Sequence, residues 1–320
     1  MKIKHSHLVK TIIAFFILSS LFISYWLNST PSNKQQIEQA TAQPNQSRII
    51  SLAPSITETL FSLDLIDQVV GVTRFCKYPP AATSITNVGG YSDPSFETMV
   101  ALKPTLIISL NEHKKVRQQL SPFNIKTLTL NNRSIEGIIN SIETVGRATG
   151  KTNTAKVLVK NIRAEINKID KSTNILNKPS VLITVGRQLD SKKISEIVIA
   201  GHDGFYSEMI TIAGGKNAYK GDIAFPTLSG EGIINLNPDI IIDIIPNPDH
   251  AQLDKTAITQ QWKTSYDISA TRNNRIHVLD DNYMVIPGPR FIKIIRQLVK
   301  IFHPNIELKE ASIINSPSDI

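Results

Sequence analysis

Cysteine is almost absent from this chain, and its scarcity excludes one way of stabilising a fold and one way of anchoring a chain. Cys76 is the one cysteine among 320 residues, so no internal disulfide can form. No cysteine stands directly after the apolar run near the amino terminus, so a lipidated amino-terminal cysteine is not expected. The thiol of Cys76 is predicted to be a small buried filler rather than a reactive group.

Motifs of catalysis are missing as well. The sequence has no glycine-rich dinucleotide motif after its first strand, no phosphate-binding P-loop, no G-x-S-x-G nucleophile turn and no H-E-x-x-H zinc motif. A direct zinc or manganese site made by His113, His202 and Asp203 lacks the ligand spacing that such sites need. We therefore predict a protein that is not an enzyme and that holds no metal or resident cofactor.

The excess of basic residues is mild and spread along the chain. The formal net charge is +8, and the bases are not interleaved with aromatic residues, which make up 6% of the sequence. Proteins that bind nucleic acid gather such residues on one face. The charge therefore predicts no nucleic-acid partner, while an anionic small ligand stays open.

One strongly apolar run stands near the amino terminus. Residues Thr11 to Leu27 carry no charge and follow Lys2, Lys4 and Lys10, which is the layout of a secretory signal peptide or signal anchor. We assign residues 1–30 to this segment, and residues 31–47, which are polar, to a linker. The rest of the chain is expected in the periplasm, either released by cleavage or tethered to the inner membrane.

Strand and helix patterns alternate over the rest of the chain, which predicts an α/β fold of two Rossmann-like lobes with parallel sheets. The first lobe is residues 48–150 and the second is residues 176–303; a single long helix within 151–175 joins them, and 304–320 form a tail. Strands are expected at 48–52, 69–72, 105–110, 126–130, 180–185, 239–245 and 275–279. Helices are expected from Ser55, through a capping box with Glu58, from Asp93-Pro94, from Ile135 to Gly150, and over 152–172, 205–213 and 290–302.

A repeated segment indicates that the two lobes share one plan. Glu97 precedes Pro104 by seven positions, Glu231 precedes Pro238 by seven, and an aliphatic strand follows each proline. The repeat places one first-turn glutamate at the same corner of each lobe. The plain structural interpretation is that each acid complements the dipole of its helix.

Four segments carry a family resemblance in their order along the chain: the run from Arg48 to Glu58 (RIISLAPSITE), Gly71-Val72-Thr73, Tyr78-Pro79-Pro80, and Val100 to Pro104 (VALKP). Together they resemble the helical-backbone periplasmic binding proteins that serve ABC importers of cobalamin, ferric siderophores and haem. The resemblance covers residues 48–302. Tyr78-Pro79-Pro80, Gly89-Gly90-Tyr91 and the run from Ala213 to Asn217 (AGGKN) are similar to the cobalamin-binding branch.

The resemblance implies a monomeric receptor that captures a metal chelate, cobalamin foremost, in a cleft between the lobes. It implies delivery to an inner-membrane ABC permease with its ATPase subunits, and docking of Glu97 and Glu231 on arginines of that permease. In cobalamin receptors aromatic side chains line the cleft, because their rings cover a flat macrocycle. The matching positions in this sequence are Tyr78, Tyr91 and Leu110 in the first lobe, with Phe225 and Tyr283 in the second.

Two positions depart from the cobalamin branch. Leu110 stands where an aromatic is expected, and the arginine of the last loop is replaced near Ile286, with Arg290 four residues on. A ferric siderophore or haem therefore stays open as the chelate, and a chelatase-like enzyme on a two-lobed scaffold is the alternative from another class. Arg74, Lys77 and Arg290 could neutralise an anionic group of the ligand, but each is predicted to be solvated surface charge.

Overall fold

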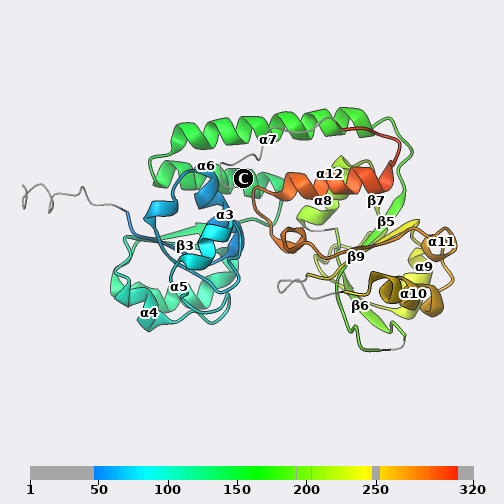
Figure 1. Ribbon diagram of the computed structural model, residues 1–320, viewed down its shortest axis with the longest axis horizontal. Helices are drawn as coiled ribbons and strands as arrows, with labels where there is room; N and C mark the ends of the chain where they lie inside the picture. Colours follow the sequence, from blue (N-terminus) through cyan, green and yellow to red (C-terminus); the bar gives the residue numbers. More distant parts are fainter. Residues whose placement is uncertain (1–46, 192, 203, 247–252, 309–320) are drawn as a thin grey trace, which may run out of the picture. The chain divides into compact units, whose positions relative to one another are not determined.

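The first lobe, which contains β3 in Figure 1, is built on a four-stranded parallel sheet with the strand order β2-β1-β3-β4. All five residues of the third strand are buried, as expected where helices cover both faces of a parallel sheet. The predicted strands and their parallel pairing are confirmed in this lobe. Its elements in chain order are β1 (Ile49–Ser51), α3 (Pro54–Ser62), η1 (Ile66–Gln68), β2 (Val69–Val72), η2 (Pro80–Ser84), α4 (Phe96–Ala101), β3 (Leu106–Leu110), η3 (Asn111–His113), α5 (Lys114–Leu120), η4 (Ser121–Phe123), β4 (Thr127–Leu130) and α6 (Ile135–Ala148).

The second lobe has a six-stranded mixed sheet with the order β10-β9-β5-β6-β8, and β7 also pairs with β5. The strands β10, β9 and β5 are parallel, whereas β6 runs antiparallel to both β5 and β8. The expectation of a parallel sheet is therefore wrong for the part of this sheet that contains β6 and β8. Its elements are β5 (Ser180–Arg187), β6 (Glu196–Ile199), α8 (Phe205–Ile212), β7 (Lys216–Asn217), β8 (Thr227–Ser229), α9 (Gly230–Leu236), β9 (Ile240–Ile244), α10 (Lys255–Ser265), α11 (Ser269–Arg272), β10 (Ile276–Leu279), η5 (Asn282–Val285) and α12 (Phe291–Phe302).

A single long helix, α7 (Thr152–Thr173), joins the two lobes and confirms the predicted connecting helix. It packs against α6 in the first lobe and against α8 and α12 in the second, as Figure 1 shows for α6 and α12. Arg163 on this helix pairs with Glu136 on α6, and Glu165 pairs with Arg296 on α12. Apolar packing and two ion pairs therefore connect α7 to both lobes.

Two predicted helix starts are wrong, because the N-cap residue of each helix differs from the one that the sequence predicts. Helix α3 begins at Pro54, one residue before Ser55, and its N-cap residue Ala53 makes no side-chain cap hydrogen bond. Helix α4 begins at Phe96, and its cap is Ser95, whose hydroxyl accepts from the Thr98 amide at 3.2 Å. The proline at the first position starts α3 without a cap, which leaves its polar side chains available elsewhere.

The computed structural model describes residues 47–191, 193–202, 204–246 and 253–308, all within one compact unit, Ser47–Ile320. The predicted signal segment 1–30, the linker up to residue 46 and the tail from residue 309 lie outside the described residues. Within the described ranges, no helix has both the length and the apolar character needed to cross a membrane.

Candidate functional site

The residues predicted to bind ligand lie in, or at the ends of, the segments that connect strands and helices. Tyr78 follows β2, Leu110 ends β3, and Tyr283 follows β10. These three lie at or beyond the carboxyl ends of parallel strands, which is where ligands bind in open α/β sheets. Tyr91 precedes α4, and Phe225 precedes β8.

Two of the predicted tyrosines, one from each lobe, meet at Arg290. The guanidinium carbon lies 3.8 Å from the ring centroid of Tyr78 and 5.4 Å from that of Tyr283. The same guanidinium donates two hydrogen bonds to the Glu58 carboxylate, at 2.6 and 3.0 Å. Because the side chains of Glu58 and Arg290 are 2% and 10% exposed, the prediction that Arg290 is solvated surface charge is wrong. It is one half of a buried ion pair.

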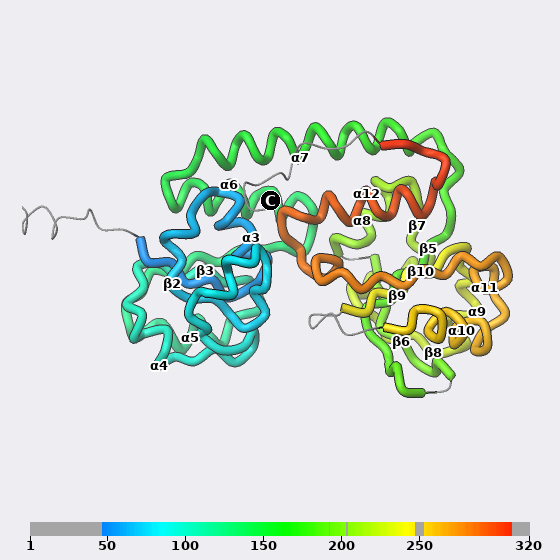
Figure 2. The backbone as a smooth tube through the Cα atoms, viewed as in Figure 1, coloured from blue at the N-terminus to red at the C-terminus, as the bar shows by residue number. Residues whose placement is uncertain are grey.

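This ion pair belongs to a contact between the lobes, made by the loop that runs from β10 to α12. Figure 2 shows this orange segment reaching the blue helix α3. Asn132 donates to the Pro287 carbonyl at 2.9 Å and to the Ser55 hydroxyl at 3.2 Å. A Cβ built on Gly288 would lie 3.1 Å from the Glu58 carboxylate and 3.2 Å from the Cα of Ser55, so a larger residue there would require a neighbour to shift.

The electrostatics of this contact follow from its burial. Burial raises the pKa of the Glu58 carboxyl, and the Arg290 guanidinium opposes that rise. Burial also raises the pKa of Tyr283 to about 12, with the carboxylate of Asp281 adding to the effect. Tyr283 therefore keeps its proton at neutral pH, and its hydroxyl donates to the Gln297 side chain at 2.9 Å.

Tyr91 and Leu110 lie together in the first lobe, around the buried side chain of His113. The rings of Tyr91 and His113 have their centroids 4.4 Å apart, and His113 Nδ1 accepts from the Leu110 amide at 2.9 Å. Burial lowers the pKa of His113, so the imidazole is neutral at pH 7. Leu110 is buried, whereas Tyr91 is partly exposed, so the tyrosine offers the accessible surface of this pair.

Phe225 in the second lobe stands at the position equivalent to Tyr91 in the first. Each residue lies six positions before the repeated glutamate of its lobe, Glu97 or Glu231. Phe225 is 50% exposed, and its ring meets Tyr206 edge to face with centroids 6.5 Å apart. Each lobe therefore presents one accessible aromatic side chain at the same point of the repeat.

The repeated glutamates themselves occupy matching sites, as the sequence predicts. Glu97 is the second residue of α4, and Glu231 is the second residue of α9. Ser95 caps the first helix and Ser229 caps the second, each accepting from the amide three residues on. Both glutamates are exposed, and the structure shows no ion pair for either of them among the described residues.

With this geometry, the family model described as periplasmic binding protein matches residues 49–283. The chain belongs to the periplasmic binding protein family. It is 28% identical over 276 residues to the uncharacterized ABC transporter substrate-binding lipoprotein YvrC of Bacillus subtilis, covering 84% of this chain and 83% of the relative. It is 28% identical over 258 residues to the vitamin B12-binding protein of Vibrio campbellii, covering 80% of this chain and 89% of the relative.

Solved structures of the same family share the two-lobed α/β fold. The periplasmic heme-binding protein RhuT from Roseiflexus sp. RS-1, in its apo form, superimposes with a TM-score of 0.69 at 27% identity. The match covers 81% of this chain and 98% of that protein. The predicted two-lobed fold and the family resemblance are thereby confirmed.

Three exposed apolar side chains of this binding protein were missed by the sequence predictions. Phe75 lies in the loop between β2 and Tyr78, Ile223 lies two residues before Phe225, and Val285 lies in η5 beside Tyr283. Single exposed apolar side chains are common on protein surfaces, so these three are of interest only because they lie beside predicted site residues. The sequence could have indicated them only through their closeness to the predicted site residues. No periodic pattern distinguishes exposed apolar residues in such connecting segments.

Of the other candidate residues that the structure describes, Cys76 lies in the core and the rest lie on the surface. Cys76 is buried as predicted, its sulfur 3.2 Å from the Thr73 hydroxyl, and burial raises the pKa of the thiol. Arg74 and Lys77 are exposed as predicted. His202 is exposed, and Asp203 lies outside the described residues; among the residues that are described, no group of three histidine, cysteine or carboxylate side chains could hold a metal.

Proposed function

We propose that this chain is the substrate-binding component of an ABC importer, and that it captures a metal chelate between its lobes and delivers it to an inner-membrane permease. One observation carries the proposal. Each lobe presents, at the same six-residue offset, an exposed or partly exposed aromatic side chain and an exposed first-turn glutamate. A protein that holds one ligand between two lobes and docks on a two-subunit permease needs this pairing of surfaces.

Cobalamin is the chelate that we favour. The sequence is similar to a vitamin B12-binding protein over most of both chains. Tyr78, Tyr91, Phe225 and Tyr283 supply rings on both lobes for a flat macrocycle. In this proposal Leu110 contacts the ligand only at its edge, because it is buried.

Haem is the second candidate, for a specific reason. Leu110 leaves one position of the first lobe without the aromatic side chain that the cobalamin branch implies. A heme-binding protein is among the similar structures at 27% identity. The same aromatic rings would cover a porphyrin. Cobalamin and haem would therefore bind at the same place between the lobes and differ only in their affinity for the chain.

The remaining features of the proposal follow from the family. We infer a periplasmic location, either free or tethered by the amino-terminal segment, and action as a monomer without catalysis. The named relatives are binding proteins or substrate-binding lipoproteins, which supports a transport role over a chelatase-like one. Turnover of a chelate by the purified chain would reverse this preference.

Calorimetric titration of the fragment Ser47–Ile320 tests the choice of ligand. Calorimetry is the suitable readout because Trp262 is fully buried and donates its ring hydrogen bond to Asp243, so its fluorescence is not expected to report on a ligand. With cyanocobalamin, haem and a ferric siderophore as titrants, we expect one-to-one binding of cyanocobalamin with a Kd of about 1 µM or below. Binding of haem alone would overturn the choice of cobalamin, and binding of none of the three would overturn the proposal.

A further inference from the structure

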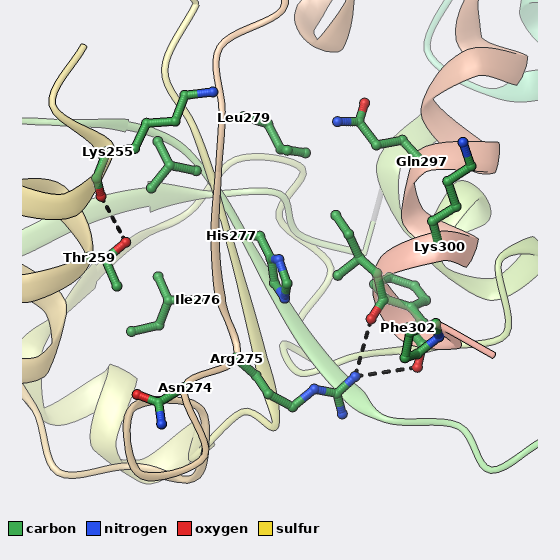
Figure 3. Close-up of a pocket in the computed structure, with 13 residues that line it drawn as sticks. Lys255, Thr259, Asn274, Arg275, Ile276, His277, Leu279, Gln297, Lys300 and Phe302 are labelled. Atoms are coloured by element: carbon green, nitrogen blue, oxygen red, sulfur yellow. Dashed lines mark hydrogen bonds between the residues drawn. The ribbon is translucent and has the colours of Figure 1, made fainter.

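A groove of about 810 Å³ runs along β10 in the second lobe, formed by residues that take no part in the proposed ligand and docking sites. Figure 3 shows the strand passing through the middle of the groove. Lys255 and Thr259 from α10 stand on one side of the strand, and Gln297 and Lys300 from α12 stand on the other. The edge of the sheet therefore forms the floor, and two helices form the walls.

The floor of this groove is a sheet edge, whose outward backbone groups have no partner strand among the described residues. In the described part of the chain, β10 is the terminal strand of its sheet and pairs with β9. The carbonyls of Arg275 and Leu279 accept from β9 and the residue after it, at 3.0 and 2.9 Å. Because backbone groups alternate in direction along a strand, those of Ile276 and Val278 face the groove. An edge of this kind is a template for an added strand.

The charge of the groove indicates which strand would add. Its described lining includes three basic residues, Lys255, Arg275 and Lys300, and no acidic one. Asp280 beside the groove pairs with Lys255 at 2.6 Å. The three basic side chains and this one carboxylate together give a net charge of +2. Burial lowers the pKa of His277, so its imidazole adds no charge at pH 7.

We propose that β10 is a docking site for an extended acidic segment of a partner protein, which adds to the sheet edge as a further strand. Alternate side chains of the segment then lie against α10 and α12, where Lys300 meets its carboxylates. A second copy of this chain fits less well, because pairing β10 with itself would bring the basic side chains of both copies together.

The first lobe supplies a matched control. Strand β4 pairs with β3 as β10 pairs with β9, and the Ile107 amide donates to the Lys126 carbonyl at 2.9 Å. By the same alternation, the backbone groups of Thr127 and Thr129 face outward. Thr129 is therefore the counterpart of Val278, on an edge for which we propose no partner.

The test measures fluorescence anisotropy of a labelled seven-residue peptide of alternating valine and glutamate, titrated with the full chain. We expect saturable binding at about 100 µM or below that weakens as salt is raised, and no binding of the valine and lysine analogue. Val278→Pro removes an outward amide without breaking the ladder to β9, and should weaken binding at least about tenfold. Thr129→Pro should leave the affinity unchanged.

A charge variant tests the proposal independently, in case the proline variant fails to fold. Lys300→Glu should weaken peptide binding about threefold, while Lys263→Glu, on an exposed part of α10 outside the groove, should not. Equal affinity for the acidic and basic peptides, or equal loss in Val278→Pro and Thr129→Pro, would overturn the proposal. Sedimentation that shows a dimer of the chain, lost in Val278→Pro, would replace the acidic partner by a second copy.

Discussion

Reversal of both repeated glutamates, Glu97→Arg with Glu231→Arg, is expected to abolish uptake of the chelate while leaving its affinity for the purified chain unchanged. Each carboxylate is exposed, stands at the same point of a capped helix, and has no ion-pair partner among the described residues. In the proposed complex each meets an arginine of one permease subunit, so reversal replaces attraction by repulsion. Like charges placed together in an interface cost several kcal/mol, which is about a hundredfold or more in affinity.

The measurement is uptake of labelled cyanocobalamin by cells that carry the variant, with calorimetry of the purified protein beside it. Asp67→Arg with Glu196→Arg is the matched control, because these acids are also exposed, one on each lobe, and lie outside the repeat. We expect single reversals to reduce uptake less than the double reversal. Normal transport by the double variant would exclude these glutamates from docking.

Removing the guanidinium that connects the lobes, by Arg290→Met, is expected to lower the free energy of unfolding by about 3–5 kcal/mol. The substitution leaves Glu58 buried without its partner, and it removes the cation that packs between Tyr78 and Tyr283. Desolvation of an unpaired carboxylate is the larger cost. Urea denaturation monitored by circular dichroism measures the change.

Two controls separate this explanation from a general loss of packing. The double variant Glu58→Leu with Arg290→Met should recover most of the stability, since an apolar pair of similar volume often replaces a buried ion pair at little cost. Arg272→Ala breaks the exposed pair with Asp267 and should cost less than about 1 kcal/mol. A loss below about 1 kcal/mol in Arg290→Met would contradict the structural role of the pair.

Local patterns predicted the elements that depend on local physics. The strands of the first lobe, the connecting helix and the repeat around Glu97 and Glu231 follow from aliphatic runs, helical spacing and turn residues, and the structure confirms them. In the repeat even the backbone agrees, since Lys103 and Asn237 both take positive φ, 46° and 40°, just before the proline. Spacing alone was enough there because each feature lies within a dozen residues.

Features that depend on distant partners were not predictable. Glu58 and Arg290 lie 232 positions apart, so the first was interpreted as a cap and the second as surface charge. The short strands β6 and β8 were missed because each is defined by its partner strand: β6 pairs with β5, and β8 pairs with β6. The placement of Tyr91 against His113 likewise comes from the packing of a loop against η3, which is distant from it in the sequence.

Calorimetric titration of three proteins with cyanocobalamin tests most directly whether one ligand is held by both lobes. Tyr91→Ala and Phe225→Ala change equivalent positions of the first and second lobes, and Phe123→Ala changes an exposed aromatic side chain elsewhere. If one chelate contacts both lobes, each of the first two variants should weaken one-to-one binding about tenfold or more, and the third should not. Weaker binding in only one of the two variants Tyr91→Ala and Phe225→Ala, or binding of two ligands per chain, would contradict capture between the lobes.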